Sequence, residues 1–236
     1  MRNRYPRAHR PAQQAIDRLS NTLPPQIMQG NVDRALGVVI ADDDGIQRLT
    51  GERDGCRVGA LQRRLIDQAI MDPLTGAFNR RHMEGSLGDA IERQRRSSAP
   101  ASLLLIDVDH FKRINDQLGH AKGDGVLKGI VSVVGKRSRK LDLLFRIGGE
   151  EFMLLLPDTQ EAAAAILAEQ LRASIAKSPL LDGRRVTVSV GVGELQPGES
   201  MDSWIKHTDD ALYAAKNAGR NRVARAAEVP AQEQIQ

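Results

Sequence analysis

The stretch Gly148-Gly149-Glu150-Glu151-Phe152 places two glycines directly before two carboxylates and an aromatic residue. Residues 141–147 before it and residues 152–156 after it read as strands, so the stretch is predicted to be the tip of a β-hairpin. Glycine tolerates a positive φ in a hairpin turn, and without a Cβ it lets a phosphate group come close to the backbone. An ordinary tight turn would explain the glycines equally well, but it would not explain the acids that follow them.

A second acidic stretch, Asp107-Val108-Asp109, stands at the end of a run over 102–107 that is predicted to be a buried strand. A strand end beside a hairpin tip would bring Asp107 and Glu150 together. Paired carboxylates next to bare backbone suit Mg2+ that carries phosphate groups. The two stretches therefore predict one acidic site for a phosphate-bearing ligand.

The whole chain has 236 residues, of which 41% are hydrophobic, enough for one full domain and a short appendage. It contains no apolar run of about 18 residues, so no membrane span is expected, and its arginine-rich start lacks the apolar core of a secretory signal. The single Cys56 excludes an internal disulfide and favours a reducing compartment, with the cytoplasm as the expected location. Much of the positive charge lies near the chain ends, and no stretch interleaves basic and aromatic residues, so no nucleic acid is expected as a partner.

The chain is predicted to divide near residue 72. Residues 1–71 are expected to form a regulatory or dimerisation segment, in which prolines leave room for only a short helix around 15–23. Residues 42–45 read as a turn or a helix start. Apolar residues recur at helical spacing over about 46–71, which predicts a stalk helix that pairs with its own copy. At the other end, residues 227–236 are expected to be a disordered tail.

Downstream of residue 72, strands and helices alternate. Helices are predicted over 111–118, 161–176 and 201–217, and a glycine-rich connection over 119–125 leads into a further helix that ends at about Lys136. A strand is expected over 186–192 and an edge strand over 222–226. This mixture of a hairpin and crossover units predicts an α+β domain over 72–226, with a central, mainly antiparallel sheet flanked by helices that lie mainly on one face.

Five motifs stand in order along residues 72–226, and together they resemble the GGDEF-domain diguanylate cyclase family, here as a GGEEF variant. Besides the hairpin, they are Asp72-Pro73-Leu74-Thr75-Gly76 with Asn79-Arg80-Arg81, Asp107-Val108-Asp109-His110-Phe111-Lys112 with Asn115-Asp116, Gly119-His120 with Gly123-Asp124, and Ala211-Leu212-Tyr213 with Lys216 and Gly219-Arg220-Asn221. One motif alone would be weak evidence, but several in register support one another by context. The resemblance implies a palm-like fold related to the ferredoxin fold, preceded here by the short helical stalk.

The resemblance also implies a reaction, in which two GTP molecules condense into cyclic di-GMP and release two pyrophosphates. It assigns Asp107, Glu150 and the carbonyl of Val108 as ligands of Mg2+, with Mn2+ able to replace it. Glu151 is the expected base for the 3′-hydroxyl, with a solvated turn carboxylate as the alternative, and Glu150 and Lys112 complete the catalytic set. Asp109 is either a further ligand or the cap of the helix that begins near Phe111, and we favour the cap.

By the same resemblance, Asn115 and Asp124 select the base. A carboxylate accepts guanine N1–H and the 2-amino group together, and an amide serves O6. Separately, each residue would also suit a helix cap. Lys216 and Arg220 are four apart near a helix end and are expected on one face, where they would bind the distal phosphates or complement the helix dipole. The expected substrate-binding set is completed by His110, Phe111, Gly148 and Gly149.

Arg139 and Asp142 match the RxxD pattern through which this family binds its own product, and they precede Glu150 by eleven and eight residues. A guanidinium grips a phosphate or a guanine edge with two bonds, while the aspartate accepts guanine N1–H. Arg93 is expected to add a second contact. These three residues are the predicted inhibitory site.

The product contains two phosphodiester bonds, so two half-sites must face each other and a homodimer is expected. The other expected partners are GTP, cyclic di-GMP at the inhibitory site, and a regulatory protein that binds the N-terminal segment. Two alternatives are an inactive effector that binds cyclic di-GMP through Arg139 and Asp142, and a scaffold in which only the stalk is active. Neither needs the acidic site, so we favour the cyclase.

Overall fold

The structure is a computed structural model that describes residues 40–42, 45–47 and 70–229. The chain separates into two compact units, Met1–Ala69 and Ile70–Gln236. In the first unit, β1 (Ile40–Asp42) and β2 (Gly45–Gln47) form an antiparallel pair in which Asp42 pairs with Gly45, so these two residues belong to strands and not to a helix start. The short helix predicted around 15–23 lies outside the described residues.

The start of the predicted stalk helix differs from the structure, whereas its end agrees to within a residue, because Ile70 is helical. Residues 46–47 belong to β2, and Met71 forms an isolated bridge with Phe78. Of the predicted tail, residues 227–228 belong to a 3-10 turn, η1 (Ala226–Glu228). The middle of the predicted stalk and residues 230–236 lie outside the described residues, and both stay predictions.

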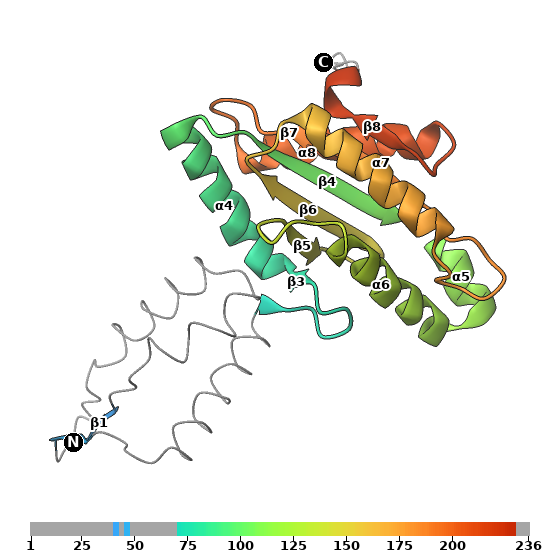
Figure 1. The fold of residues 1–236 in the computed structure, drawn as a ribbon, viewed down its shortest axis with the longest axis horizontal. Coiled ribbons are helices and arrows are strands. Elements are labelled where there is room, and N and C mark those ends of the chain that lie inside the picture. Colours follow the sequence, from blue (N-terminus) through green and yellow to red (C-terminus); the bar gives the residue numbers. More distant parts are fainter. Residues whose placement is uncertain (1–39, 43–44, 48–69, 230–236) are drawn as a thin grey trace, which may run out of the picture. The chain divides into compact units, whose positions relative to one another are not determined.

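The second unit is built on a six-stranded sheet with the order β3-β5-β6-β4-β7-β8 (Figure 1). The four inner strands pair in antiparallel fashion, and the short outer strands β3 and β8 are added in parallel, which confirms a mainly antiparallel α+β sheet. The strands are β3 (Phe78–Asn79), β4 (Ala101–Val108), β5 (Leu143–Arg146), β6 (Glu151–Pro157), β7 (Val188–Glu194) and β8 (Val223–Arg225).

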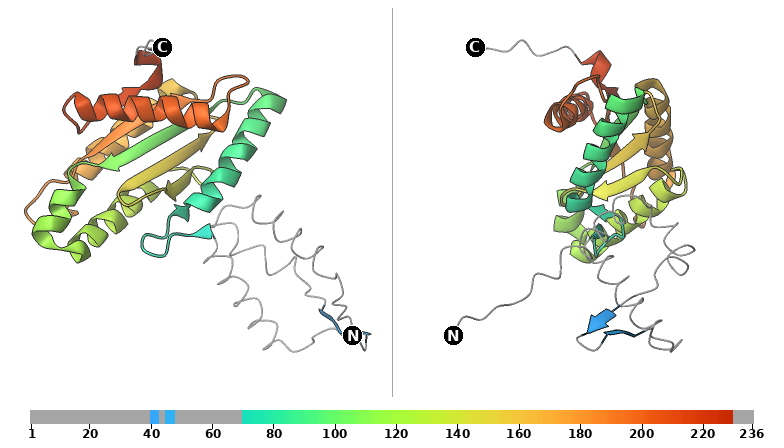
Figure 2. Two further views of the ribbon diagram at one scale, coloured as in Figure 1. Left: turned by 180° about the vertical axis from the view of Figure 1, so that it is seen from behind. Right: turned by 90° about the vertical axis from the view of Figure 1, so that its left-hand side faces the viewer.

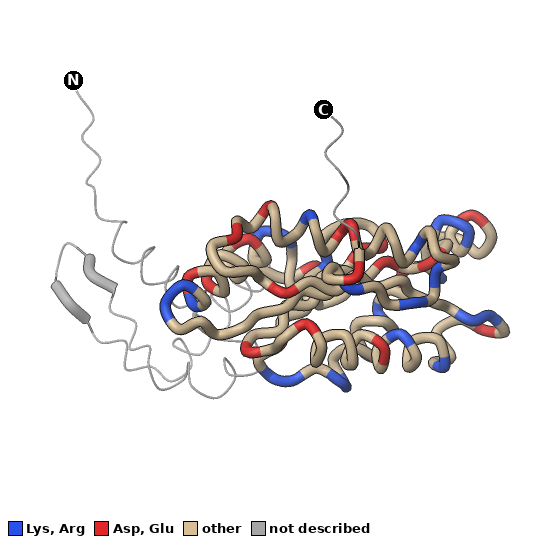
Figure 3. The backbone as a smooth tube through the Cα atoms, turned by 90° about the horizontal axis from the view of Figure 1, so that it is seen from above, with Lys and Arg blue, Asp and Glu red and all other residues tan. Residues whose placement is uncertain are grey.

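The helices that flank the sheet are α4 (Arg80–Ser97), α5 (Phe111–Leu118), α6 (His120–Gly135), α7 (Glu161–Lys177) and α8 (Met201–Asn217). In the described part of the chain, no helix has both the length and the apolar character needed to cross a bilayer. Charged residues gather on the helices and the connecting loops, and the strands are mostly uncharged (Figure 3). This distribution is the one expected for a sheet covered on both sides.

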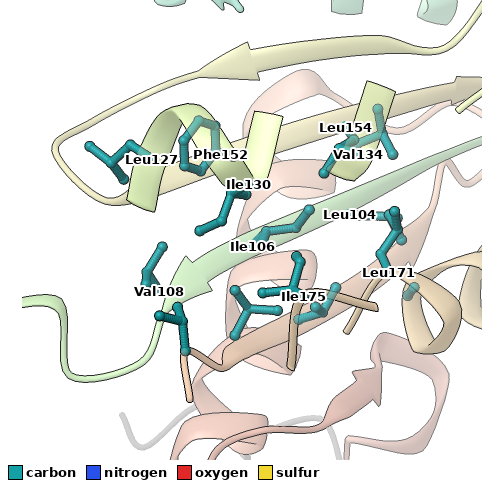
Figure 4. Close-up of a cluster of buried hydrophobic side chains, with 14 of the residues drawn as sticks. Leu104, Ile106, Val108, Leu127, Ile130, Val134, Phe152, Leu154, Leu171 and Ile175 are labelled. Atoms are coloured by element: carbon teal, nitrogen blue, oxygen red, sulfur yellow. The ribbon is translucent and has the colours of Figure 1, made fainter. Parts of the chain in front are cut away.

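The core has two halves, one on each face of the sheet. Successive side chains of a strand point to opposite faces: Leu104 and Ile106 of β4 pack with α6 and α7 (Figure 4), and Leu103 and Leu105 pack with α4 and α8. The prediction that the helices lie mainly on one face is therefore wrong, as the edge-on view in Figure 2 shows. Every residue of β4 is buried, and its sequence is a nearly continuous apolar run without an alternating polar face. Such a run is typical of a strand whose sheet is covered by helices on both faces.

Sequence reasoning missed α4 altogether. Met83, Leu87 and Ile91 are spaced four apart and are all buried, and Asn79 caps the helix by accepting a hydrogen bond from the His82 amide at 3.0 Å. The glycine-rich connection predicted over 119–125 is also wrong, because α6 begins at residue 120. Gly119 (φ 82°) alone breaks the chain between α5 and α6.

The seating of α8 on β7 depends on two glycines. A Cβ added at Gly191 would lie closer than 3.0 Å to the backbone of Thr208 and Leu212, and one at Gly193 would collide with the Thr208 hydroxyl. Trp204, which is fully buried, locks the same helix by donating from its indole N–H to the Gly193 carbonyl at 3.0 Å. The helix therefore lies directly against the strand backbone.

We predict that Gly191→Ala lowers the free energy of unfolding by about 3 kcal/mol, because backbone atoms of α8 must move to admit the methyl group. Gly88→Ala is the matched control: it lies inside α4 with no atom within 4 Å of the added Cβ, so it should stabilise by about 1 kcal/mol through helix propensity. Chemical denaturation followed by the fluorescence of Trp204, the single tryptophan, measures both changes. Equal stability of the two variants would contradict this account of how α8 is seated.

Candidate functional site

The hairpin tip lies beside the end of β4. Asp107 pairs with Glu151 across the β4–β6 ladder, and the Val108 amide donates to the Glu150 carbonyl at 3.3 Å. Directly opposite residues of an antiparallel pair share one face of the sheet, and for Asp107 this is the face covered by α8. The structure thus brings Asp107, Glu150 and Glu151 together, as the two acidic stretches predict.

Lys216 reaches this acidic cluster from the last turn of α8. Its ammonium group lies 2.8 Å from Asp107 Oδ2, and the Asp107 side chain is only 11% exposed. Burial raises the pKa of Glu150, the charges of Asp107 and Glu151 raise it further, and Lys216 lowers it. The four groups therefore share one electrostatic environment, and the cation offsets part of the repulsion among the three acids.

The turn of the hairpin differs from the prediction in its backbone. The Ile147 amide donates to the Glu151 carbonyl at 3.0 Å and the Glu151 amide to the Gly148 carbonyl at 3.4 Å, yet neither Gly148 nor Gly149 has a positive φ. The absent Cβ is used differently at Gly148, where it would stand 2.7 Å from the Glu151 carboxylate. Because that atom is the end of a flexible side chain, an added methyl group would require only the Glu151 carboxylate to move, and the backbone gives no conformational reason for glycine at either position.

Sequence reasoning missed Arg146, which links the hairpin turn to Asp72 in the opening motif. Its guanidinium donates to the Gly149 carbonyl at 2.8 Å and to Asp72 at 3.1 Å, and both side chains of this ion pair are less than one-fifth exposed. Burial alone would raise the pKa of Asp72, but hydrogen bonds from Thr75 and Arg146 hold it below its ordinary value. The sequence signal was an arginine just before the hairpin and an aspartate in the opening motif.

Asn115 on α5 and Asp124 on α6 lie on the two helices joined at Gly119. Neither caps a helix at this junction, because Gly119 occupies both cap positions without a side-chain bond. A Cβ at Gly123 would collide with the Asn115 amide, so the glycine makes room for that side chain. Among the described residues, the buried Asn115 Oδ1 has no hydrogen-bond partner, and such an orphaned atom calls for an explanation.

Arg220 is not on the face of α8, contrary to the prediction. The helix ends at Asn217, and the Gly219 and Arg220 amides donate to the Lys216 and Ala215 carbonyls, which is a Schellman cap around Gly219 (φ 111°). Arg220 follows this cap as an exposed residue of the loop. It has a left-handed backbone (φ 63°).

Asp109 is not a helix cap either, because His110 (φ 57°) occupies the cap position of α5 and makes no side-chain bond there. The buried carboxylate of Asp109 instead accepts hydrogen bonds from the hydroxyls of Thr187 and Ser189, both at 2.7 Å, and from the Asn221 amide at 3.0 Å. Phe111 is buried at the start of α5, and Lys112 beside it is exposed.

The predicted inhibitory residues lie at the opposite end of the sheet from the hairpin tip. Asp142 Oδ2 accepts from the Arg139 amide at 2.6 Å in the turn before β5, which leaves the Arg139 side chain exposed; burial raises the pKa of Asp142 against that bond. Arg93 makes a two-bond ion pair with Asp158, just after β6. Because Leu143 pairs with Leu155, both groups belong to the same end of the β5–β6 ladder.

We expect Glu150→Gln to raise the free energy of unfolding of the nucleotide-free protein, measured with a chelator present at pH 7. The raised pKa means that the folded protein binds this proton more tightly than the unfolded chain. The cost of the ionised carboxylate is therefore fully present above the raised pKa and vanishes below the ordinary value of 4.5. The gain should shrink as the pH falls towards that value. Glu84→Gln, on an exposed glutamate of α4, is the control, and a gain independent of pH would contradict the shift.

Comparison with known proteins agrees with this geometry. The profile of the family described as diguanylate cyclase, GGDEF domain, matches residues 69–222. The diguanylate cyclase DgcM of Escherichia coli is 46% identical over 163 residues, which cover 69% of this chain and 40% of that protein. The response regulator PleD of Caulobacter vibrioides is 40% identical over 164 residues, which cover 67% of this chain and 36% of that protein. The chain thus spans less than half the length of these relatives.

Solved structures agree as well. The coiled coil and GGDEF domain of DgcB from Caulobacter crescentus, in complex with c-di-GMP, match with a TM-score of 0.68 and 31% identity, over 73% of this chain and 94% of that one. The diguanylate cyclase SiaD of Pseudomonas aeruginosa, solved with its activator SiaC, matches with a TM-score of 0.66 and 37% identity, over 74% of this chain and 68% of that one. On the family match and these identities, the chain belongs to the GGDEF-domain family of diguanylate cyclases.

Proposed function

We propose that this chain is a diguanylate cyclase, which condenses two GTP molecules into cyclic di-GMP and releases two pyrophosphates. The observation that carries the proposal is the convergence of Asp107, Glu150 and Glu151 with Lys216 at the hairpin tip. Three acids that raise one another's free energy need a cationic ligand to balance them. A divalent metal ion is such a ligand, and it can carry the phosphates of a nucleoside triphosphate, which the family identifies as GTP.

The residues present fit Mg2+, or Mn2+ in its place. Within the described residues, no group of three or more His, Cys, Asp and Glu is arranged to hold a metal. Mg2+ nevertheless takes only one or two protein carboxylates and completes its shell with water and phosphate, and Asp107 and Glu150 supply that number. The Val108 amide points to the Glu150 carbonyl, so its own carbonyl points to the same side. When bound, the metal would neutralise the phosphates and polarise the attacked phosphorus.

The chain's own groups orient the substrate and move one proton. The 3′-oxygen of one GTP bonds to the α-phosphorus of the other, the bond to pyrophosphate breaks, and Glu151 takes the hydroxyl proton. Lys216 would bind the distal phosphates from the end of α8, with Arg220 from the following loop and Lys112 from α5. The same event repeated in the opposite direction closes the ring.

Guanine recognition falls to Asn115 and Asp124, with His110 and Phe111 beside them at the start of α5. The Asn115 amide nitrogen would donate to guanine O6, and the Asp124 carboxylate would accept N1–H and the 2-amino group. The lack of a side-chain cap at Gly119 supports this role over helix capping. Adenine would leave the acid unpaired, so ATP should be a poor substrate.

One domain binds one GTP, so two copies must face each other and the active form is a homodimer. A stalk within residues 1–71 would raise the effective concentration of the two domains, and a regulatory protein that binds this segment would set their geometry. SiaD, which was solved with an activator protein, supports such control in a relative of this chain.

The proposed reaction can be tested by analysing the products formed from GTP. With GTP and Mg2+ the purified protein should form cyclic di-GMP, at a rate per chain that rises with protein concentration, and with ATP it should form none. Glu150→Gln should lower the rate at least about 100-fold, because a metal ligand is lost, while Glu84→Gln should leave it unchanged. Product analysis by chromatography measures these rates. A protein that forms no product even after forced dimerisation, but binds cyclic di-GMP, would favour the inactive effector.

Product inhibition can be tested separately from the reaction. Cyclic di-GMP should bind at Arg139 and Asp142, with Arg93 as the second contact, and slow the enzyme. Arg139→Ala should weaken this binding about 100-fold, because a two-bond guanidinium contact is removed, and should leave the uninhibited rate intact. Arg137→Ala, two residues earlier on the same exposed turn, is the control. Calorimetry with cyclic di-GMP measures the affinity of both variants. Inhibition that persists unchanged in Arg139→Ala would contradict the assignment of the inhibitory site to Arg139 and Asp142.

A further inference from the structure

Asp109 joins three segments that are far apart in the sequence. It directly follows β4, it accepts from Thr187 and Ser189 at the start of β7, and it accepts from the Asn221 amide in the loop after α8. The residue is 5% exposed, and its two oxygens receive three hydrogen bonds, with Thr187 and Asn221 sharing Oδ2. The protein itself thus uses three of the about four acceptor positions of this buried carboxylate. Its bonds go to the β7 end of the sheet and to the loop after α8, so Asp109 is not the cap of α5.

The loop that Asp109 holds has an unusual backbone. Arg220 (φ 63°) and Asn221 (φ 46°) are consecutive left-handed residues without being glycine, a conformation that persists only where the surroundings impose it. Three further bonds to this loop are the Schellman bond of the Arg220 amide, a bond from Arg172 to Asn221 Oδ1 at 2.6 Å, and a bond from the Val190 amide to the Arg222 carbonyl at 2.9 Å. The bond to Asp109 ties this loop to the strand end that carries Asp107.

We propose that Asp109 is a positioning residue of the phosphate site. Its carboxylate sets the place of the loop that carries Arg220 relative to Asp107, and hence the distance between a phosphate-binding cation and the metal ligands. The inference rests on the proposed function, because it assumes that Arg220 binds the distal phosphates. The role assigned to Asp109 is distinct from those of the metal ligands and the phosphate-binding cations, because it acts through the bonds that hold the loop.

The test compares the affinities of a non-reactive GTP analogue and of GMP, measured by calorimetry with Mg2+ present. Arg220→Ala should weaken the triphosphate about tenfold and leave GMP nearly unchanged, because only the distal phosphates are lost. Asp109→Ala should lower the same triphosphate-to-GMP ratio by a similar factor. Asp109→Asn should recover most of it, since its amide oxygen still accepts from Asn221 and Thr187 while its NH2 donates to the Ser189 hydroxyl.

The double variant Asp109→Ala with Arg220→Ala separates positioning from a general loss of structure. If Asp109 acts through Arg220, the double variant should be no worse than either single variant, whereas independent effects would add. An Asp109→Ala variant that weakens both nucleotides equally, or whose effect adds to that of Arg220→Ala, overturns the proposal. If Arg220→Ala itself leaves the ratio unchanged, the phosphate assignment under the proposed function fails, and the role of Asp109 falls with it.

Unfolding followed by Trp204 fluorescence verifies that each variant is folded. Should Asp109→Ala fail this check, Thr187→Val takes its place, because it removes one donor to Oδ2 and keeps the carboxylate. The same fall in the triphosphate-to-GMP ratio, smaller in size, is then expected. An unchanged ratio in a folded Thr187→Val variant overturns the proposal.

Discussion

The direct contact between α8 and the backbone of β7 is the constraint on which the site depends. Gly191 and Gly193 remove the side chains that would hold the helix away, and Trp204 fastens it through the Gly193 carbonyl. A helix raised by one side-chain layer would withdraw Lys216 from Asp107 and would carry the following loop away from Asp109. The chemistry of the hairpin tip is thus set by packing between two elements that hold no acid of the cluster.

The cluster itself is a local compromise between stability and function. Glu150 sits near Asp107 and Glu151, and its pKa is raised first by burial and then by the charges of these two acids. The left-handed pair after α8 adds strain of about 1 kcal/mol or more for each residue. The partly buried ion pair of Arg146 with Asp72 and the triply hydrogen-bonded carboxylate of Asp109 hold these unfavourable groups in place. Functional sites of enzymes commonly concentrate such tension, which the rest of the fold must offset.

Much of this arrangement could be predicted from the sequence, because it follows from periodicity and pairing. The apolar runs around Asp107 and the GGEEF stretch fixed two neighbouring strands, and their pairing explains why the acids meet. The errors arose where the cause lies in tertiary contact. Gly123 is typical of a loop in sequence, but it lies inside α6, where the absence of a Cβ leaves space for the Asn115 side chain. Arg220 keeps helical spacing from Lys216, but the Schellman cap at Gly219 turns the chain before it. From its position Asp109 is a plausible helix cap, but the fold brings Ser189 and Asn221, which are remote in sequence, within hydrogen-bond distance of its carboxylate.

The order of strands in the sheet has a consequence for biosynthesis. The inner strands are finished on one side by β3, from the start of the domain, and on the other by β8, from its end. An uncovered strand edge can pair with another chain and so promote aggregation. The outer edge of β7 is covered only after β8 has been synthesised. The loop with Arg220 lies just before β8, so it is among the last parts of the domain to leave the ribosome. A nascent chain therefore completes its protection from aggregation and the loop that we propose to bind phosphate within the same few residues.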